Sequence, residues 1–386
     1  MKILLQGNYA VAEAVRLARV QLVAAYPITP QTPIYEKLSD MENEGTLPGI
    51  MMRTESEHSA MAACIAASLT GVRTFTATAS QGLALMHEML HFASGNRVPI
   101  VMCNVNRVVA VPWAFGSDQS DSLSQRDTGW LQFYCEDAQE AFDTVVQAYR
   151  IAEQVLLPVM VAIDGFFTSH FIEPIEIPDQ ASIDAFLPSF NIPTRFNEED
   201  PAYIANVVNP EQYMGYRQRS FEDMEATRSV IKTANEEYQR IIGRGYDVVE
   251  TVSTDDAEIV LVTSGAMTST ARVAIQSLRD KGMRVGLLKM KAFRPFPTQE
   301  VQEALKNVPK VAVIDRNISL GKGGIWCQEL KAALYPLEHR PMVTGYIAGI
   351  CGCGADVSPD MIEDMVVKAF EREKPDDLPI WVRRDQ

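Results

Sequence analysis

The chain has 386 residues, of which 47% are hydrophobic and 22% are charged, so it is long enough for two or three domains with a large apolar core. Its 35 Lys and Arg against 50 Asp and Glu give a formal net charge of −15, which argues against nucleic acid as a partner because phosphate binding needs clustered cations. No stretch reaches about 18 uninterrupted apolar residues, and no signal-peptide core is evident, so we expect a cytoplasmic protein without a membrane span.

The first 165 residues predict short strands that alternate with helices. Apolar runs are separated by stretches of helical periodicity, a pattern typical of βαβ units around a mostly parallel sheet. Runs such as 98–106 and 157–164 lack polar alternation, as expected for strands that are covered on both faces.

The pattern changes at about residue 170 and returns at about residue 254. Region 170–250 is first Pro-rich and then, over 220–245, predicts a long amphipathic helix, so we interpret it as a connector packed on the first domain. We therefore expect a first domain of residues 1–250, which includes this connector, and a smaller α/β domain of residues 251–386. The strands expected in the second domain are 257–265, 283–291 and 310–317.

Six cysteines are scattered along the chain without a Cys-x-x-Cys pair. This spacing favours neither a disulfide framework nor an iron–sulfur cluster bound by this chain alone. We interpret most of them as small buried hydrophobic residues in a reducing compartment. Cys351 and Cys353 form the one close pair, and both a redox-sensitive site and two small residues in a turn remain open for them.

His87, Glu88 and His91 match the H-E-x-x-H pattern of zinc proteases, in which two imidazoles share one face of a helix. A zinc site needs a third ligand, and the next glutamate, Glu136, lies beyond a long loop. A zinc hydrolase is therefore a remote alternative, and we predict no metal site on this chain. The simpler interpretation is a buried helix face formed by Met86, Met89, Leu90 and Ala93.

Two turns between a strand and a helix indicate a functional site more clearly than the H-E-x-x-H pattern does. In the turn Y-P-I-T-P, each residue before a proline is held extended, which fixes Thr29 at the carboxyl edge of the sheet, where α/β folds bind ligands. A rigid turn with Thr29 or Thr32 as a helix cap is the alternative. Glu57 opens a later helix, where the dipole favours a carboxylate, and the small residues after it suggest that it is partly buried. Arg107 ends an apolar run at the same edge.

Together these segments resemble the α subunit of the pyruvate:ferredoxin oxidoreductase family of 2-oxoacid:acceptor oxidoreductases. The resemblance covers nearly the whole chain apart from region 170–250, and the H-E-x-x-H pattern lies inside one of its segments. It implies a thiamine diphosphate-binding-type (pyrimidine-side) parallel-sheet α/β domain, followed by a smaller transketolase C-terminal-like α/β domain. The four segments that carry it are YPITP, ESEHSAMAACIAASLTGVRTFTATASQGLALMHEMLHFASG, PIVMCNVNR and SDQSDSLSQRDTGWLQFY.

The resemblance also implies roles for three residues. Glu57 matches the carboxylate that hydrogen-bonds the aminopyrimidine ring of thiamine diphosphate. Thr29 matches a residue near the reacting carbonyl of the substrate, and Arg107 matches the arginine that binds the substrate carboxylate. The other residues expected to contact the cofactor are Tyr26, Pro27 and Ile28.

The reaction implied is oxidative decarboxylation of a 2-oxoacid, with pyruvate, coenzyme A and ferredoxin as the first expectation and anaerobic metabolism as the setting. The chain lacks the G-D-G…N metal motif and the cluster cysteines of the family. The Mg and diphosphate site and the [4Fe-4S] clusters are thus expected on partner chains, namely a β-type subunit with γ- and δ-type subunits. Alone, the chain should be inactive.

Two alternatives stay open at this point. Trp113 and Phe115 follow Arg107 in a loop that borders the substrate in the family, so phenylglyoxylate, oxalate or 2-oxoisovalerate remain possible substrates. The chain could also be a non-catalytic assembly subunit, although such a scaffold would need neither Glu57 nor Thr29.

Overall fold

A seven-stranded sheet organises the first part of the chain, within a computed structural model that describes residues 2–190, 204–352 and 356–383. The strand order is β12-β6-β7-β5-β4-β2-β3, and every pair is parallel except β12 with β6. The strands are β2 (Leu22–Ala25), β3 (Ile50–Arg53), β4 (Thr74–Thr78), β5 (Val101–Asn106), β6 (Leu131–Tyr134), β7 (Val159–Asp164) and β12 (Ala292–Arg294).

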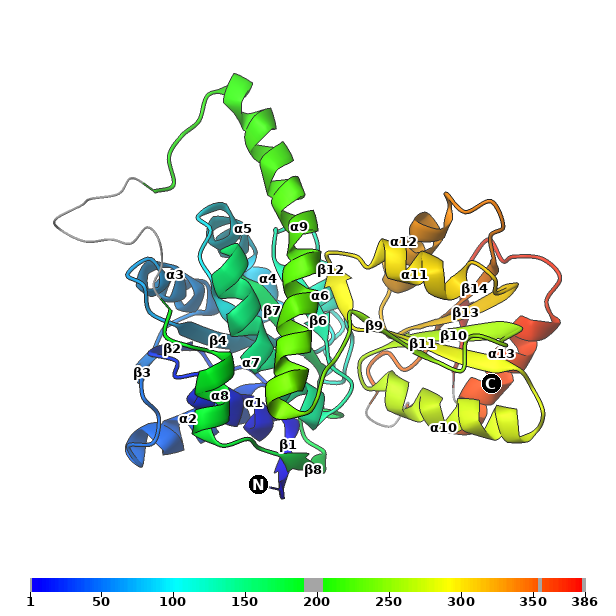
Figure 1. The fold of residues 1–386 in the computed structure, drawn as a ribbon, viewed down its shortest axis with the longest axis horizontal. Helices are drawn as coiled ribbons and strands as arrows, with labels where there is room; N and C mark the ends of the chain where they lie inside the picture. The colour runs from blue at the N-terminus through cyan, green and yellow to red at the C-terminus, as the bar shows by residue number, and fades with distance from the viewer. Residues whose placement is uncertain (1, 191–203, 353–355, 384–386) are drawn as a thin grey trace.

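Helices cover both faces of this sheet (Figure 1). In β5, Val101 and Cys103 pack in the core shared with α1, α2 and α7, whereas Met102 packs on the opposite face with α3 and α5. This burial on two sides explains why the strands read as continuous apolar runs. The helices are α1 (Gly7–Leu17), α2 (Thr32–Asn43), α3 (Glu57–Ser68), α4 (Ser80–Leu85), α5 (His87–Gly95), α6 (Ser120–Leu123) and α7 (Ala138–Val155).

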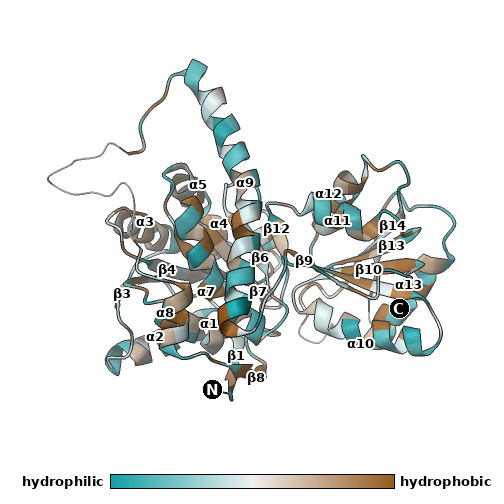
Figure 2. Ribbon diagram, in the orientation of Figure 1, coloured by the Kyte–Doolittle hydropathy of each residue, from teal (hydrophilic) through white to brown (hydrophobic). Residues whose placement is uncertain are grey.

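Region 170–250 contains more regular structure than its composition suggests. It supplies β8 (Ile172–Glu176), which pairs antiparallel with β1 (Lys2–Gln6), and the helices α8 (Gln180–Phe186) and α9 (Pro210–Ile242). The long helix predicted over 220–245 is confirmed, but it begins ten residues earlier, at Pro210. Its second half packs on α7, while its first half extends away from the sheet and is mostly hydrophilic (Figures 1 and 2).

A second sheet of six strands forms the C-terminal part, in the order β15-β14-β13-β10-β11-β9, parallel except for β9. Figure 2 shows its strands as mostly hydrophobic. The strands are β9 (Val249–Val252), β10 (Ile259–Ser264), β11 (Val285–Met290), β13 (Lys310–Asp315), β14 (Met342–Ile347) and β15 (Ile380–Trp381). The helices α10 (Met267–Asp280) and α13 (Pro359–Glu371) cover one face, and α11 (Thr298–Leu305) and α12 (Ile325–Leu334) cover the other.

Two features join the sheets. The chain leaves β11 and places β12 at the edge of the first sheet, a strand that the sequence pattern did not predict. Beside it, the buried ammonium of Lys289 lies 2.9 Å from Oε2 of Glu136 and 2.8 Å from Oε2 of Glu140, both near the start of α7. Because a buried charge is costly without its partner, this network favours one relative position of the two sheets.

Candidate functional site

The carboxyl edge of the first sheet collects the residues singled out in the sequence. Thr29 follows β2, Glu57 follows β3 and Arg107 follows β5, and these strands are parallel members of one sheet. Ligands of open α/β sheets bind at this edge. The three side chains therefore start from neighbouring positions although they are far apart in sequence.

Gln31 holds the Y-P-I-T-P turn in place. Its backbone N–H donates to the carbonyl of Ile28 at 3.0 Å, and its side-chain Nε2 donates to the carbonyl of Tyr26 at 3.0 Å. The side chain of Thr29 is exposed, and Pro27 beside it is exposed as well. The N-cap of α2 is Gln31, with no side-chain capping bond, so the interpretation of Thr29 or Thr32 as a cap is wrong.

Glu57 begins α3 and is 6% exposed, so the predicted partial burial is confirmed. Burial raises the pKa of its carboxyl, and the nearby Arg107 offsets part of this shift. Within the described ranges, no other side chain donates a hydrogen bond to the carboxylate of Glu57. The helix begins here because the hydroxyl of Ser56 caps it, accepting from the N–H of Ser59 at 3.2 Å.

A glycine on α4 makes room for this carboxylate. A Cβ atom at Gly82 would lie 2.4 Å from Oε1 of Glu57 and 2.5 Å from Oγ1 of Thr78. The backbone of α4 thus forms one wall of the Glu57 site, and only glycine permits the approach. The hydroxyl of Thr78 is buried and finds no hydrogen-bond partner among the described residues.

Arg107 is a buried cation that donates its side-chain hydrogen bonds to neutral oxygens. Burial lowers the pKa of its guanidinium, and the charges of Asp121 and Glu57 offset part of this shift. Arg107 is 4% exposed, and its Nη1 donates to the carbonyl oxygen of Thr29 at 2.5 Å, while Nη2 donates to Oε1 of Gln81. The ring of Phe115 lies 5.5 Å from its Cζ. In the part of the chain that is described, no carboxylate forms an ion pair with this guanidinium. Since burying an unpaired charge is costly, the site favours an anionic ligand.

Asp121, which the sequence analysis did not single out, anchors the elements around Arg107. Its Oδ2 accepts from the backbone N–H of Ser80 at 2.9 Å, from Nδ2 of Asn104 at 3.1 Å and from the backbone N–H of Arg107 at 3.1 Å. Complete burial raises its pKa to about 7. The one sequence signal was the presence of Asn104 and Asn106 within an otherwise apolar strand.

The H-E-x-x-H segment lies on α5 with its polar side chains outward. His87, Glu88 and His91 are exposed, and Nδ1 of His87 lies 2.6 Å from Oε1 of Gln125. No set of three His, Cys, Asp or Glu side chains suited to a metal ion occurs in the described residues. The predicted buried face is confirmed for the fully buried members, which are Met86, Leu90 and Ala93.

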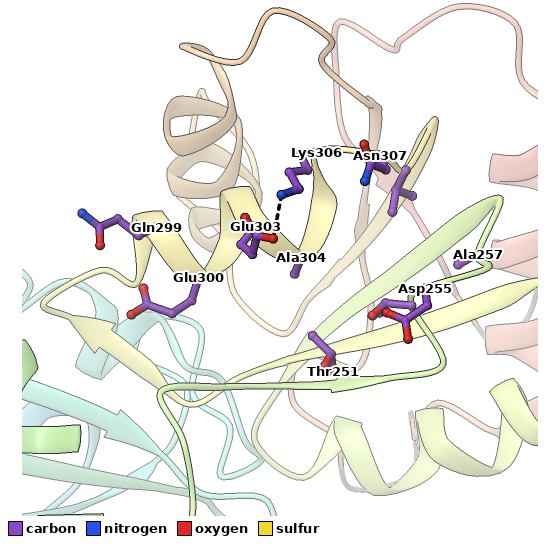
Figure 3. A pocket seen from close by; sticks show the side chains of 11 residues that line it. Thr251, Asp255, Ala257, Gln299, Glu300, Glu303, Ala304, Lys306 and Asn307 are labelled. Carbon is purple, nitrogen blue, oxygen red and sulfur yellow. Dashed lines mark hydrogen bonds and ion pairs between the residues drawn. The ribbon is translucent and has the colours of Figure 1, made fainter. Parts of the chain in front are cut away.

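A cavity of about 700 Å³ lies elsewhere, between α11 and the segment after β9 (Figure 3). Its lining includes the carboxylates of Asp255, Glu300 and Glu303, and Lys306 pairs with Glu303 at 2.6 Å. A pocket lined by acidic groups is unfavourable for a carboxylate ligand. The carboxyl edge of the first sheet, where the guanidinium of Arg107 has no ion-pair partner among the described residues, is the better site for an organic acid.

The five cysteines in the described ranges are free, and four of them are buried, as predicted for most. Cys351 is partly exposed and its backbone packs against Gly116, in the loop that carries Phe115. Cys353 lies outside the described residues, so its pairing with Cys351 stays open. In the same ranges, no helix is both long and apolar enough to cross a bilayer.

Two family models match the chain and, with the fold and the edge site, define a thiamine diphosphate-binding α/β protein of the oxidoreductase class. The model described as pyruvate flavodoxin/ferredoxin oxidoreductase, thiamine diphosphate-binding, matches residues 13–236. The model described as pyruvate:ferredoxin oxidoreductase core domain II matches residues 257–362.

Curated relatives agree along nearly the full length. The pyruvate synthase subunit PorA of Methanothermobacter thermautotrophicus is 44% identical over 380 residues, which cover 98% of this chain and 97% of that one. The ketoisovalerate oxidoreductase subunit VorA of Pyrococcus horikoshii is 46% identical over 354 residues, which cover 91% and 90%. The chain belongs to the pyruvate flavodoxin/ferredoxin oxidoreductase family, as the sequence motifs predicted.

Solved structures support the same fold. The 2-oxoglutarate:ferredoxin oxidoreductase from Magnetococcus marinus matches with a TM-score of 0.75 at 22% identity, over 96% of this chain and 65% of that chain. A split-gene transketolase matches with a TM-score of 0.59 at 13% identity, over 95% and 98%. The predicted fold class, a pyrimidine-type cofactor domain followed by a transketolase C-terminal-like domain, is confirmed.

Proposed function

We propose that this chain is the α subunit of a thiamine diphosphate-dependent 2-oxoacid:ferredoxin oxidoreductase. The observation that carries the proposal is the buried guanidinium of Arg107, which donates to two neutral oxygens and forms no direct ion pair with a carboxylate among the described residues, although Glu57 and Asp121 lie close enough to act on its charge. A 2-oxoacid supplies the missing negative charge and can accept two parallel hydrogen bonds from the guanidinium. In the overall reaction the carboxylate carbon leaves as CO2, the acyl group passes to the thiol of coenzyme A, one proton is released, and two ferredoxins each take one electron.

The residues around Glu57 fit the aminopyrimidine ring of thiamine diphosphate. When bound, this cofactor supplies the carbon nucleophile for the keto group. The carboxyl of Glu57 is buried, has a raised pKa and receives no side-chain hydrogen bond from the described residues, so it is suited to share a proton with a ring nitrogen. The unpartnered hydroxyl of Thr78 offers a further polar contact beside it, and Tyr26, Pro27 and Ile28 remain the proposed cofactor contacts from the neighbouring turn.

Partner chains complete the enzyme in this proposal. The chain lacks a diphosphate-anchoring metal motif, and its described residues hold no cluster of metal-ligating side chains. A β-type subunit would hold the Mg ion, the diphosphate and [4Fe-4S] clusters, and γ- and δ-type subunits would pass electrons to ferredoxin in the cytoplasm. Residues 1–250 would face the pyrimidine ring, and residues 251–386 would serve assembly.

Pyruvate is the first substrate to test, and 2-ketoisovalerate is the second. The exposed aromatic rings of Trp113 and Phe115 favour the second, because Phe115 places an apolar surface beside Arg107 that a branched side chain could contact.

The test is to purify the complex anaerobically through a tag on this chain and to measure CO2 release with several 2-oxoacids. Activity that needs thiamine diphosphate and falls at least about 100-fold in Glu57→Gln would support the proposal. Arg107→Met should raise the KM for the 2-oxoacid. A complex without 2-oxoacid-dependent electron transfer, or an Arg107→Met variant with an unchanged KM, would overturn the proposed site.

A further inference from the structure

Gln81 lies between the two proposed functional residues. It is the second residue of α4, directly before Gly82, whose Cα faces the carboxylate of Glu57, and its own side chain contacts Arg107. Ser80 before it has a φ of +51°, in the left-handed region that a serine rarely adopts. A backbone held in that region is a reason to look for a function nearby.

The contacts of Ser80 hold this turn in place. Its backbone N–H donates to Oδ2 of Asp121 at 2.9 Å, and its hydroxyl lies 2.5 Å from the carbonyl oxygen of Val108. The same Oδ2 of Asp121 accepts from the backbone N–H of Arg107. One buried carboxylate therefore fixes both the turn that carries Gln81 and the strand end that carries Arg107.

The orientation of the Gln81 amide follows from its neighbours. Its Oε1 faces Nη2 of Arg107, and a guanidinium can only donate, so the amide oxygen must stand on that side. The amide nitrogen Nε2, on the same amide carbon, is then the free donor of this side chain beside the guanidinium. It is buried and has no hydrogen-bond partner among the described residues. An unpartnered buried donor beside an unpaired cation is a second group that favours an oxygen-rich ligand.

An amide at this position also keeps the charge of Arg107 available. A glutamate would have nearly the same shape, but its carboxylate would pair with the guanidinium and remove the reason for an anion to bind. Gln81 orients the guanidinium through a neutral oxygen and adds no negative charge to those of Glu57 and Asp121 nearby.

We propose that Gln81 is a second substrate-binding residue, whose Nε2 donates to the carboxylate of the 2-oxoacid while its Oε1 orients Arg107 toward the same group. This inference rests on the proposed function. It places an amide and a guanidinium on one carboxylate, so that Gln81 contributes to binding before any bond is broken.

The test uses the complete complex with Gln81→Glu and Gln81→Met, assayed with pyruvate and 2-ketoisovalerate and with oxamate as a non-reacting competitor. Loss of a hydrogen bond to a charged group should raise the KM and the inhibition constant of oxamate roughly tenfold in Gln81→Met. Gln81→Glu should raise both roughly 100-fold, because it also neutralises the guanidinium. The kcat and the affinity for thiamine diphosphate should stay within about threefold, since binding lost equally in the ground and transition states changes KM alone.

The matched control is Gln299→Glu, the same substitution on the exposed first turn of α11, which should leave every constant unchanged. Arg107→Met separates the two proposals. If Arg107→Met raises the KM and neither Gln81 variant does, Gln81 has no part in binding and only this inference is overturned. An Arg107→Met variant with an unchanged KM would overturn the proposed function first. A Gln81 variant that lowers kcat at constant KM would also contradict a binding role.

Discussion

Gly82→Ala should lower the activity of the complex strongly while changing the stability of this chain only a little. The added Cβ would lie 2.4 Å from Oε1 of Glu57 and 2.5 Å from Oγ1 of Thr78, whereas unstrained contacts between such atoms are about 3.5 Å. The Thr78 side chain is stiff, so this second contact contributes an overpacking cost. The carboxylate sits at the end of a flexible side chain, so it can move away by roughly 1 Å without disturbing the backbone. Alanine in a helix also gains about 0.5–1 kcal/mol over glycine, which offsets part of an overpacking cost of about 1–3 kcal/mol. The free energy of unfolding should therefore fall by no more than about 2.5 kcal/mol.

The activity should respond much more strongly than the stability. A hydrogen bond from the carboxylate of Glu57 to a ring nitrogen that lengthens by roughly 1 Å is no longer a hydrogen bond. Loss of a charge-assisted bond costs about 1.5–3 kcal/mol, which corresponds to a drop of roughly 10- to 150-fold in kcat. The measurements are the midpoint of urea unfolding of this chain and the kcat of the complex at saturating thiamine diphosphate.

The control is Gly215→Ala on α9, where the added Cβ would meet only Nη1 of Arg219, at 3.7 Å. This variant should be as stable as the parent or slightly more stable, and fully active. If Gly82→Ala keeps its full kcat, the position of the Glu57 carboxylate does not limit the reaction. If it loses activity only in proportion to its folded fraction, the reasoning from the 2.4 Å contact is wrong.

Three further predictions concern folding and selectivity. Lys289→Met should lower the free energy of unfolding by about 1–3 kcal/mol, because it removes the cation that Glu136 and Glu140 share while Arg272 and Lys291 still pair with them; a urea titration in which stability is unchanged would contradict this. Burial raises the pKa of Asp121 to about 7, so the native state binds this proton more tightly than the unfolded state does. The free energy of unfolding should therefore fall as the pH rises from about 4 to about 7. Asp121→Asn should flatten the decline of the urea midpoint from pH 5 to pH 8, and an unchanged slope would assign that decline to other groups. Phe115→Ala should lower the preference for 2-ketoisovalerate over pyruvate roughly tenfold, measured as the ratio of kcat/KM values, and an unchanged ratio would exclude the aromatic ring from the acyl site.

The fold was predictable where burial leaves a local signature. The fully buried strands β5 and β7 read as apolar runs in the sequence, and α7 shows helical periodicity over its whole length. The edge strand β12 was missed because it has only three residues, and its place in the first sheet depends on pairing with β6, which is distant in sequence. The first ten residues of α9, from Pro210, were missed because they bury almost no apolar face and so show no amphipathic pattern.

Some residues of the candidate site could likewise be predicted from a local sequence pattern, and others could not. Glu57 and Arg107 could be placed at strand and helix ends from the local pattern, because the carboxyl ends of parallel strands converge. Gln81 and Asp121 carried no comparable signal, since a lone glutamine or aspartate in a turn is common on any surface. Their partners come from strands and loops that only the folded chain brings together.

The short helix α4 links the two halves of the site. Its first turn carries Gln81 against Arg107, and the next residue, Gly82, opens the space for the carboxylate of Glu57. The helix has six residues, too few to be stable by itself, so its position depends on the turn that Asp121 fixes. A shift of α4 would move the substrate-binding amide and the wall beside Glu57 together. Substitutions at Asp121 should therefore change both KM and kcat. Substitutions at Gln81 should change KM alone, and those at Gly82 should change kcat alone.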